Sequence, residues 1–291
     1  MSAFNDFVSL LKLEVDIYHN AKVCGNWEIQ EHELGNTCFH IVTSGQCLLD
    51  VPGLLQTEFN QGDLVIFPRE LKHKMWPVEE MKGDQEHLPY NTQLSGTGLL
   101  CGEVKIMHLF QNQLLNALPP VLLIKNDSSN GWLSHLTNLI LEESTNYHVI
   151  QSESLNRLSE MLFIYAMRYY IEKEDCQKGL LALYGDNRLA KAIKAFHISP
   201  QNKWGLNQLA NEAGMSRTSF SNYFKQKSGW TVAQYTTWWR MQSAWEKLSL
   251  GDKVVDVAEQ IGYQSEAAFS RAFQKQFGKN PGVVRRESRS H

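Results

Sequence analysis

Two stretches near the end of the chain carry the same pattern, and this repeat constrains the fold more than any other feature. They span residues 209–229 and 257–278. The matching pairs are Ala210 and Ala258, Gly214 and Gly262, Phe220 and Phe269, Phe224 and Phe273, and Gly229 and Gly278. The spacing between partners is 48 residues up to the first glycine and 49 after it, so the second copy has one additional residue in its turn. Such a repeat predicts two copies of one supersecondary unit.

Each copy is typical of two helices joined by a tight turn. The first helix is amphipathic and ends at a glycine, which adopts the left-handed conformation without a Cβ penalty. A serine suited to an N-cap follows. The second helix has only two large apolar residues, four positions apart, and is otherwise polar. This pattern predicts a helix-turn-helix, in which the second helix rests on a small core and presents its outer face to a DNA groove. The alternative is two ordinary helical hairpins.

The charge distribution supports the DNA-binding interpretation. The net charge is −3, but residues 187–291 carry sixteen Lys and Arg against seven Asp and Glu. The preceding 186 residues carry twelve Lys and Arg against twenty-four Asp and Glu. A basic segment of this length indicates a polyanionic partner, and double-stranded DNA is the first candidate. A basic surface that serves only solubility is the alternative.

The basic segment resembles the DNA-binding domain of AraC/XylS-type transcription regulators over residues 186–286. The residues that carry the resemblance are Ala258, Gly262, Tyr263, Phe269, Arg271, Phe273, Phe277, Gly278 and Pro281. The resemblance implies seven helices, with a linking helix over 232–248 that holds both helix-turn-helix units on one face of the duplex. It places the recognition helices at 216–227 and 265–276.

The resemblance also assigns the DNA-contacting residues by position. They are Arg217, Thr218, Ser221 and Asn222 in the first copy, and Gln264, Ser265, Glu266, Ala267, Ser270 and Arg271 in the second. Arg271 is the strongest single candidate, because a guanidinium at this position can reach a guanine edge or a phosphate. The alternative is a solvated arginine paired with Glu266.

The N-terminal part has a different pattern, in which short apolar runs alternate with turn residues. Examples are TCFHIVTSGQCLLDVPG from Thr37 and GDLVIFPRELKH from Gly62. Regular short strands of this kind predict an antiparallel β-barrel or sandwich. Residues 10–124 resemble the cupin effector domain found in a subset of AraC-type regulators. The chain is therefore expected to be α+β, with an antiparallel cupin-like barrel, then helices, then an all-α domain with two helix-turn-helix units.

Three segments follow from these patterns. Residues 1–125 are expected to form a cupin-like sensor domain, 126–178 a helical region, and 179–291 the DNA-binding domain. Two helices are expected over 131–145 and 153–174, from apolar residues at three- and four-residue spacing. The resemblance implies that they pair across a two-fold axis in a homodimer. Packing within one monomer is the alternative. A polar linker is expected over 172–179.

Few residues of the cupin-like segment carry recognisable chemistry. Metal-dependent cupins use a His-x-His pair, a Glu and a later His, whereas this chain has Cys38-x-His40, Gly45 and a matching His73. We therefore expect no cofactor. A zinc or copper site made from Cys38, His40, His73 and Cys101 is an alternative, as is packing of these residues in the core.

The signal is expected to enter through a pocket lined by His40, His73 and Cys101. These are polar or reactive groups on otherwise apolar strands. Oxidant sensing through Cys24 and Cys101 is a further alternative. It rests on a resemblance of Cys101-Gly102 to cupin regulators that respond to reactive chlorine species, which Cys24 matches poorly.

The function predicted from the sequence is that of a sequence-specific DNA-binding transcription activator. A small molecule or an oxidant at the cupin pocket controls it through the intervening helices, and RNA polymerase is a partner. We expect no catalytic activity, no membrane contact and a cytoplasmic location, because no apolar run approaches about eighteen residues and five cysteines without a CxxC pair fit a reducing compartment. The rival interpretation is a metal-dependent cupin enzyme with a DNA-binding tail. A third is an architectural DNA-binding protein without an effector.

Overall fold

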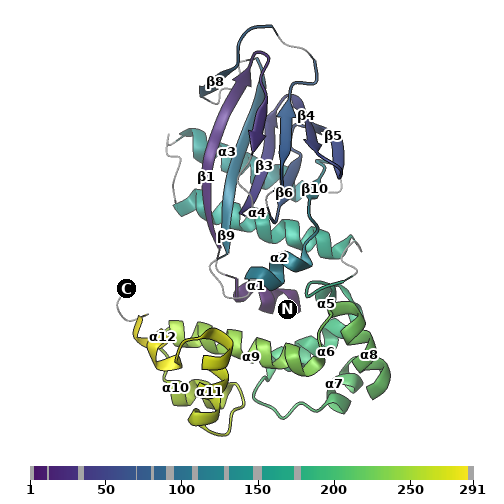
Figure 1. The fold of residues 1–291 in the computed structure, drawn as a ribbon, viewed down its shortest axis with the longest axis vertical. Coiled ribbons are helices and arrows are strands. Elements are labelled where there is room, and N and C mark those ends of the chain that lie inside the picture. Colours follow the sequence, from purple (N-terminus) through teal and green to yellow (C-terminus); the bar gives the residue numbers. More distant parts are fainter. Residues whose placement is uncertain are drawn as a thin grey trace. The chain divides into compact units, whose positions relative to one another are not determined.

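Two compact units make up the chain, and each is described by itself. The computed structural model describes residues 3–11, 13–31, 36–69, 71–79, 82–89, 95–106, 111–127, 131–146, 153–173 and 178–287. The sheet unit comprises Lys12–Gln111 and Leu118–Tyr170. The helical unit comprises Met1–Leu11, Asn112–Ala117 and Ile171–His291. This division of strands and helices confirms the predicted α+β arrangement (Figure 1).

The strands of the sheet unit pair antiparallel throughout the described residues. They are β1 (Leu13–Cys24), β2 (Ile29–Glu31), β3 (Thr37–Ser44), β4 (Gln46–Val51), β5 (Leu55–Asn60), β6 (Leu64–Phe67), β7 (His73–Trp76), β8 (Glu86–Pro89), β9 (Thr97–Ile106) and β10 (Leu122–Ile124). One sheet has the order β10-β6-β3-β9-β1-β8, and the other has the order β2-β7-β4-β5. Within the described residues the two sheets do not close into one barrel, so the predicted cupin-like fold has two separate sheets.

The core of the sheet unit lies between the two sheets. Val42 and Leu99 contribute to it from the larger sheet, and Leu49 and Phe59 contribute from the smaller one. Along β4 buried and more exposed residues alternate, as expected for a strand with one face on the core. In β3 seven of the eight residues are buried, so this strand is covered on both faces.

Both helices predicted between the strands and the basic segment are present. They are α3 (Gly131–Asn146), which contacts β3, and α4 (Glu153–Glu172). The rings of Trp132 and Tyr165 pack against each other with centroids 5.4 Å apart. The linker predicted over 172–179 lies partly outside the described residues. None of the described helices has the length and apolar character needed to span a membrane.

The helical unit contains the seven helices predicted between 186 and 286. They are α6 (Asn187–Ile198), α7 (Leu206–Glu212), α8 (Arg217–Ser228), α9 (Val232–Ser249), α10 (Val254–Gln260), α11 (Glu266–Phe277) and α12 (Pro281–Glu287). A single turn, α5 (Ala182–Gly185), precedes them, and α2 (Gln111–Ala117) contributes most of its residues to the same unit. Helix α9 is the predicted linking helix. It buries residues on several faces, including Tyr235, Trp238, Met241 and Leu248.

The first helix of the chain also belongs to the helical unit. Helix α1 (Ala3–Ser9) packs against α6. Phe4 and Phe7 are buried, and their ring centroids lie 6.4 Å and 5.2 Å from that of Tyr184. The apolar face of this helix thus covers residues that follow it by about 180 positions. No pattern in the sequence predicts this pairing.

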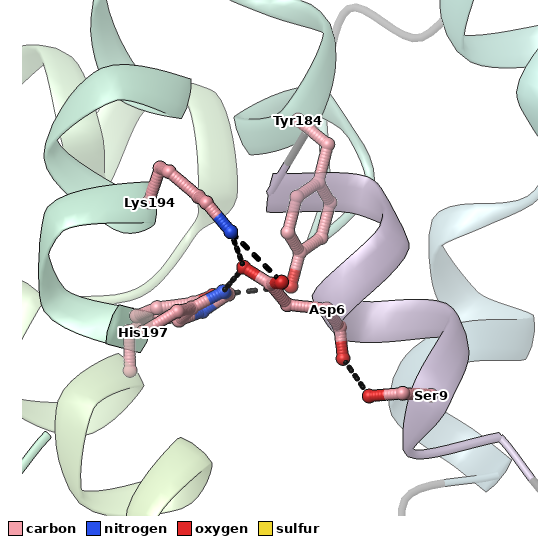
Figure 2. A network of polar contacts seen from close by, with 6 residues as sticks. Asp6, Ser9, Tyr184, Lys194 and His197 are labelled. Atoms are coloured by element: carbon pink, nitrogen blue, oxygen red, sulfur yellow. Dashed lines mark hydrogen bonds and ion pairs between the residues drawn. The ribbon is translucent and has the colours of Figure 1, made fainter. Parts of the chain in front are cut away.

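A polar network fixes α1 on the helical unit. Figure 2 shows Lys194 and His197 converging on the carboxylate of Asp6, with Lys194 Nζ 2.8 Å and His197 Nδ1 3.3 Å from Asp6 Oδ2. His197 Nε2 lies 2.8 Å from the Tyr235 hydroxyl, which lies 3.0 Å from that of Tyr184. Burial lowers the pKa of His197 to about 4 despite the hydrogen bond to Asp6. The ring is therefore neutral near pH 7, and it donates from Nδ1 to Asp6 and accepts at Nε2 from Tyr235.

Candidate nucleic-acid interface and histidine pair

The repeated segments form two helix-turn-helix units, α7–α8 and α10–α11. The turns contain residues 213–216 in the first unit and 261–265 in the second, which confirms the additional residue in the second copy. Gly214 and Gly262 have positive φ angles of 64° and 89°. These left-handed conformations explain the glycines at the ends of α7 and α10.

Serine caps begin both second helices. Ser216 Oγ accepts a hydrogen bond from Ser219 N at 3.2 Å, and Ser265 Oγ accepts one from Ala268 N at 3.2 Å. Gly229 and Gly278 end the helices in the left-handed conformation. The helices predicted at 216–227 and 265–276 are observed one residue later, at Arg217–Ser228 and Glu266–Phe277, with the predicted first residues as N-caps. The agreement is this close because the cap and stop signals are local.

The phenylalanine stripes of α8 and α11 face the interior. Phe220 and Phe224 are buried in the first helix, and Phe269 and Phe273 are buried in the second. Both pairs also contact each other, with ring centroids 5.8 Å and 5.5 Å apart. Ser228 of α8 is also buried, and Ala272 and Phe277 of α11 pack against the same core as Phe273. The opposite face of each helix is exposed.

The residues predicted to contact DNA lie on these remaining faces. Eight of the ten are exposed, and Ser221 and Ser270 are half-buried at the edge of the stripe. The exposed ones are Arg217, Thr218, Asn222, Gln264, Ser265, Glu266, Ala267 and Arg271. No described carboxylate, Glu266 included, forms an ion pair with Arg271. The guanidinium of Arg271 is thus not neutralised within the described chain.

A cationic cluster beside α8 contains residues that no sequence pattern groups together. The Arg188 guanidinium lies 4.7 Å and the Lys227 ammonium 5.8 Å from the ring centroid of Tyr223. The Tyr223 hydroxyl donates to Asp186, which also caps α6. Because these residues come from α6 and α8, only the packing of the two helices brings the charges together.

In the sheet unit, His40 and His73 form a buried pair. His40 is on β3 and His73 on β7, and their Nε2 atoms lie 3.0 Å apart. The exposed fractions of the two residues are 0% and 2%. The Phe67 ring stacks on His73 with centroids 4.2 Å apart. Burial holds the pKa of His40 well below its ordinary value, and the nearby rings of His73 and His19 lower it further.

The protonation of this pair follows from its hydrogen bonds. His73 Nδ1 lies 2.7 Å from the Leu71 carbonyl oxygen, so Nδ1 carries a proton. In a neutral ring Nε2 of His73 is then an acceptor, and His40 must donate to it from its own Nε2. Nδ1 of His40 is left as a buried acceptor, and no described residue donates a hydrogen bond to it. An unsatisfied buried acceptor of this kind is costly.

The strand register adds a third histidine and one of the predicted cysteines. Cys101 on β9 lies opposite His19 on β1 and opposite His40 on β3. Residues opposite each other in antiparallel strands point to the same face. Cys101 and His19 therefore share the face of His40, and His19 was not among the predicted residues. Its Nε2 is also buried without a hydrogen-bond partner among the described residues.

Cys24 lies apart from this group, at the end of β1, where it pairs with Glu86. Its Sγ donates to the Ser95 carbonyl oxygen at 3.0 Å. Cys38 and Cys47 are buried, and burial raises the pKa of Cys47 to about 12. Among the described residues no three or more His, Cys, Asp or Glu side chains are grouped in a way that would hold a metal ion. The side chains present do not fit the four-ligand site of metal-dependent cupins.

Comparisons with known proteins agree with these two parts. The cupin family matches residues 3–172, and a helix-turn-helix domain family matches residues 209–287. An uncharacterized HTH-type transcriptional regulator of Haemophilus influenzae is 28% identical and covers 98% of this chain and 99% of its own. The RCS-specific HTH-type transcriptional activator RclR of Escherichia coli is 26% identical, with coverage of 99% for each chain. The crystal structure of ToxT from Vibrio cholerae is 12% identical with a TM-score of 0.38, and covers 95% of this chain and 97% of its own.

Proposed function

The chain belongs to the AraC-type transcription regulators with an N-terminal cupin domain, and we propose that it binds duplex DNA through α8 and α11 under the control of a ligand in the sheet unit. The observation that carries the proposal is the shape of the two recognition helices. Each buries a narrow stripe centred on its two phenylalanines, and half of its residues are exposed. A helix used only for packing has no need of so narrow an apolar face.

The two recognition helices are proposed to read different sequences. The first presents Arg217, Thr218 and Asn222, whereas the second presents Glu266 and Arg271. Because hydrogen-bonding side chains of different chemistry prefer different base edges, one monomer is expected to read an asymmetric site. Arg188 and Lys227 are proposed to add phosphate contacts beside α8.

Selection of duplexes from a randomised library by the full chain tests this proposal. We expect enrichment of one asymmetric sequence with two recognised segments. The affinity should fall steeply with salt, since each neutralised phosphate releases about 0.9 counterion. Enrichment of no sequence, or an affinity independent of salt, would contradict it.

The effector pocket is proposed to be lined by His40, His73 and Cys101, with His19 as an additional member. His40 Nδ1 needs a hydrogen-bond donor, so the proposed ligand carries a hydroxyl or an amine group. Cys24 is kept as a separate candidate for oxidant sensing, because it lies away from the pocket. The proposed signal reaches the DNA-binding helices through the segment that contains α3 and α4.

The remaining proposals concern assembly and location. We propose that α3 and α4 form a homodimer interface, to which Leu139 and Met161 would contribute; they are apolar and 49% and 40% exposed. We propose that the protein activates transcription with RNA polymerase, is cytoplasmic and has no catalytic activity. The functional segments proposed are 1–125 for sensing, 126–178 for assembly and 179–291 for DNA binding.

A further inference from the structure

The two helix-turn-helix units are separate lobes, each with its own core. The core of the first lobe contains Phe196, Phe220 and Phe224 and receives Tyr235 from α9. The core of the second lobe contains the residues that pack around Phe269 and Phe273 and receives Met241 and Leu248 from the same helix. Helix α9 therefore connects the lobes, but each lobe packs on a different end of it. Helix α9 alone is a single connection, so a second contact between the lobes is needed to fix the angle between them.

The loop of residues 199–205, between α6 and α7, makes a second connection. Arg240 on α9 donates from Nε to the Pro200 carbonyl at 2.8 Å and from Nη2 to the Asn202 carbonyl at 3.0 Å. The planar guanidinium is suited to holding two carbonyls at once. Its Cζ also lies 5.6 Å from the Phe196 ring centroid. Arg240 thus attaches the loop to α9 near the middle of that helix.

The loop is also held by its own hydrogen bonds. Asn202 N donates to the Ser199 carbonyl at 3.1 Å, and Trp204 N donates to the Asn202 carbonyl at 2.8 Å. Trp204 Nε1 donates to the Ser199 carbonyl at 2.8 Å. A loop bonded in this way transmits a displacement at one end to the other, as a flexible linker does not.

The far side of the loop touches the second lobe at Gly262. A Cβ atom placed on Gly262 would lie 2.7 Å from the Gln201 carbonyl oxygen and 3.0 Å from its Cα. At Gly214, the equivalent residue of the first lobe, a Cβ would have no neighbour within 4 Å. Both glycines have a positive φ, which disfavours any side chain. Of the two, Gly262 also lies so close to another element that a Cβ would not fit.

Beside this contact lies an open cleft with a volume of about 620 Å³. Gln201 of the loop, Trp239 of α9 and Ile261 of the second lobe line it, together with Asp6 and Ser9 of α1 and the Leu10 that follows them. The approach of Gln201 to Gly262 therefore occurs at the edge of open space, where a missing contact would allow the second lobe to tilt.

We propose that the 199–205 loop is a brace that fixes the position of α8 relative to α11, with Arg240 and Gly262 as its positioning residues. The proposal rests on DNA binding by both recognition helices. One base pair inserted between two half-sites moves them apart by about 3.4 Å and rotates them by about 35°. A braced protein binds both half-sites at one spacing, whereas an unbraced one tolerates a change. Arg240 and Gly262 would then determine which spacing is accepted, without reading a base.

The experiment compares spacing profiles of the full chain and its variants. The probe is a duplex selected by the wild-type protein from a randomised library. Further probes have one base pair added or removed between the two recognised segments of that duplex. Two linked modules that bind together have an affinity on the order of 100-fold or more above that of one module alone. At the wrong spacing only one half-site is bound, so the affinity of the wild-type protein for the duplex should fall by about that factor. Arg240→Met should reduce the penalty to about tenfold or less and lower the affinity at the native spacing.

Matched variants separate the brace from other roles. Arg240→Lys keeps the charge but cannot hold two carbonyls in one plane, so it should behave like Arg240→Met. If Arg240→Lys restores the wild-type profile, the residue acts as a charge and the brace is refuted. Gly262→Ala should broaden the spacing profile, whereas Gly214→Ala should weaken binding equally at all spacings.

Thermal unfolding of every variant identifies those that fail to fold. If Arg240→Met does not fold, Gly262→Ala tests the brace independently. Unchanged spacing profiles in folded Arg240→Met and Gly262→Ala would show that α9 alone sets the spacing and would overturn the proposal. If the wild-type protein selects no duplex, the DNA-binding function itself fails, which is a distinguishable outcome.

Discussion

Acidification is expected to weaken the helical unit through His197. Its side chain is 1% exposed, and its pKa is lowered from 6.5 to about 4 by burial, which the hydrogen bond and charge of Asp6 only partly oppose. The folded form therefore prefers the neutral ring, and the unfolded chain binds the proton more tightly. The contribution of His197 to stability is complete above about pH 6.5 and is lost as the pH falls toward 4. Asp6 acts in a lower window, because its carboxyl pKa is already below 3.8 in the folded state.

The size of the effect follows from the two pKa values. One pKa unit corresponds to about 1.4 kcal/mol, so the free energy of unfolding should fall by about 2 to 3 kcal/mol between pH 7 and pH 4.5. This loss equals roughly a 50-fold increase in the population of the opened helical unit. His40 also has a lowered pKa, so the sheet unit is expected to respond to acid as well. The measurement must therefore resolve the two units.

Hydrogen exchange with peptide resolution provides that separation. Peptides from α6 and α9 report the helical unit, and peptides from β3 report the sheet unit. His197→Gln should abolish most of the acid response in α6 and α9 and leave that of β3 unchanged. The exposed His135 of α3 supplies the control, His135→Gln, which should alter neither. An equal acid response of α6 and α9 in wild type and His197→Gln would refute the assignment of the response to this ring.

Three further predictions concern the core and the two proposed sites. Phe273→Ala removes a fully buried ring of the second lobe and should destabilise it by about 3–5 kcal/mol, measured by thermal unfolding; a loss below about 1 kcal/mol would contradict the packing. Arg271→Ala should weaken DNA binding by about 1–3 kcal/mol and relax one base preference, or reduce the salt slope by about one if it contacts phosphate; unchanged affinity in a library assay at two salt concentrations would remove it from the interface. His40→Ala should abolish the transcriptional response to the effector while DNA binding persists, and a normal response in a reporter strain would refute the pocket.

The local features of the fold were predictable from the sequence. The serine caps, the glycine stops and the phenylalanine pairs of the recognition helices depend on residues a few positions apart. Their positions in the structure match the repeat because short-range sterics and capping determine them. The same holds for the buried linking helix, whose apolar residues already indicated more than one packed face.

Features that depend on long-range pairing were not predictable. His19 joins the face of His40 only through the register of β1 with β9, and that register shifts at an irregularity between Ile17 and His19. A shift of one residue reverses the face to which a side chain points, so sequence spacing alone does not place His19. The pairing of β1 with β9 also separates the two cysteines, because Cys24 lies five positions along β1 from His19, the residue opposite Cys101.

The pairing of α1 with α6 has a consequence for the order in which the protein folds during its synthesis. Asp6 and Lys194 are separated by 188 positions. At a translation rate of about 5–20 residues per second, α1 leaves the ribosome roughly 10 to 40 seconds before its partner is made. During this interval Phe4 and Phe7 have no Tyr184 to cover them, so α1 packs only after the helical unit that follows it by about 180 residues has been made. Nascent chains stalled before residue 184 should accordingly leave α1 open to proteases, and chains extended beyond α9 should protect it.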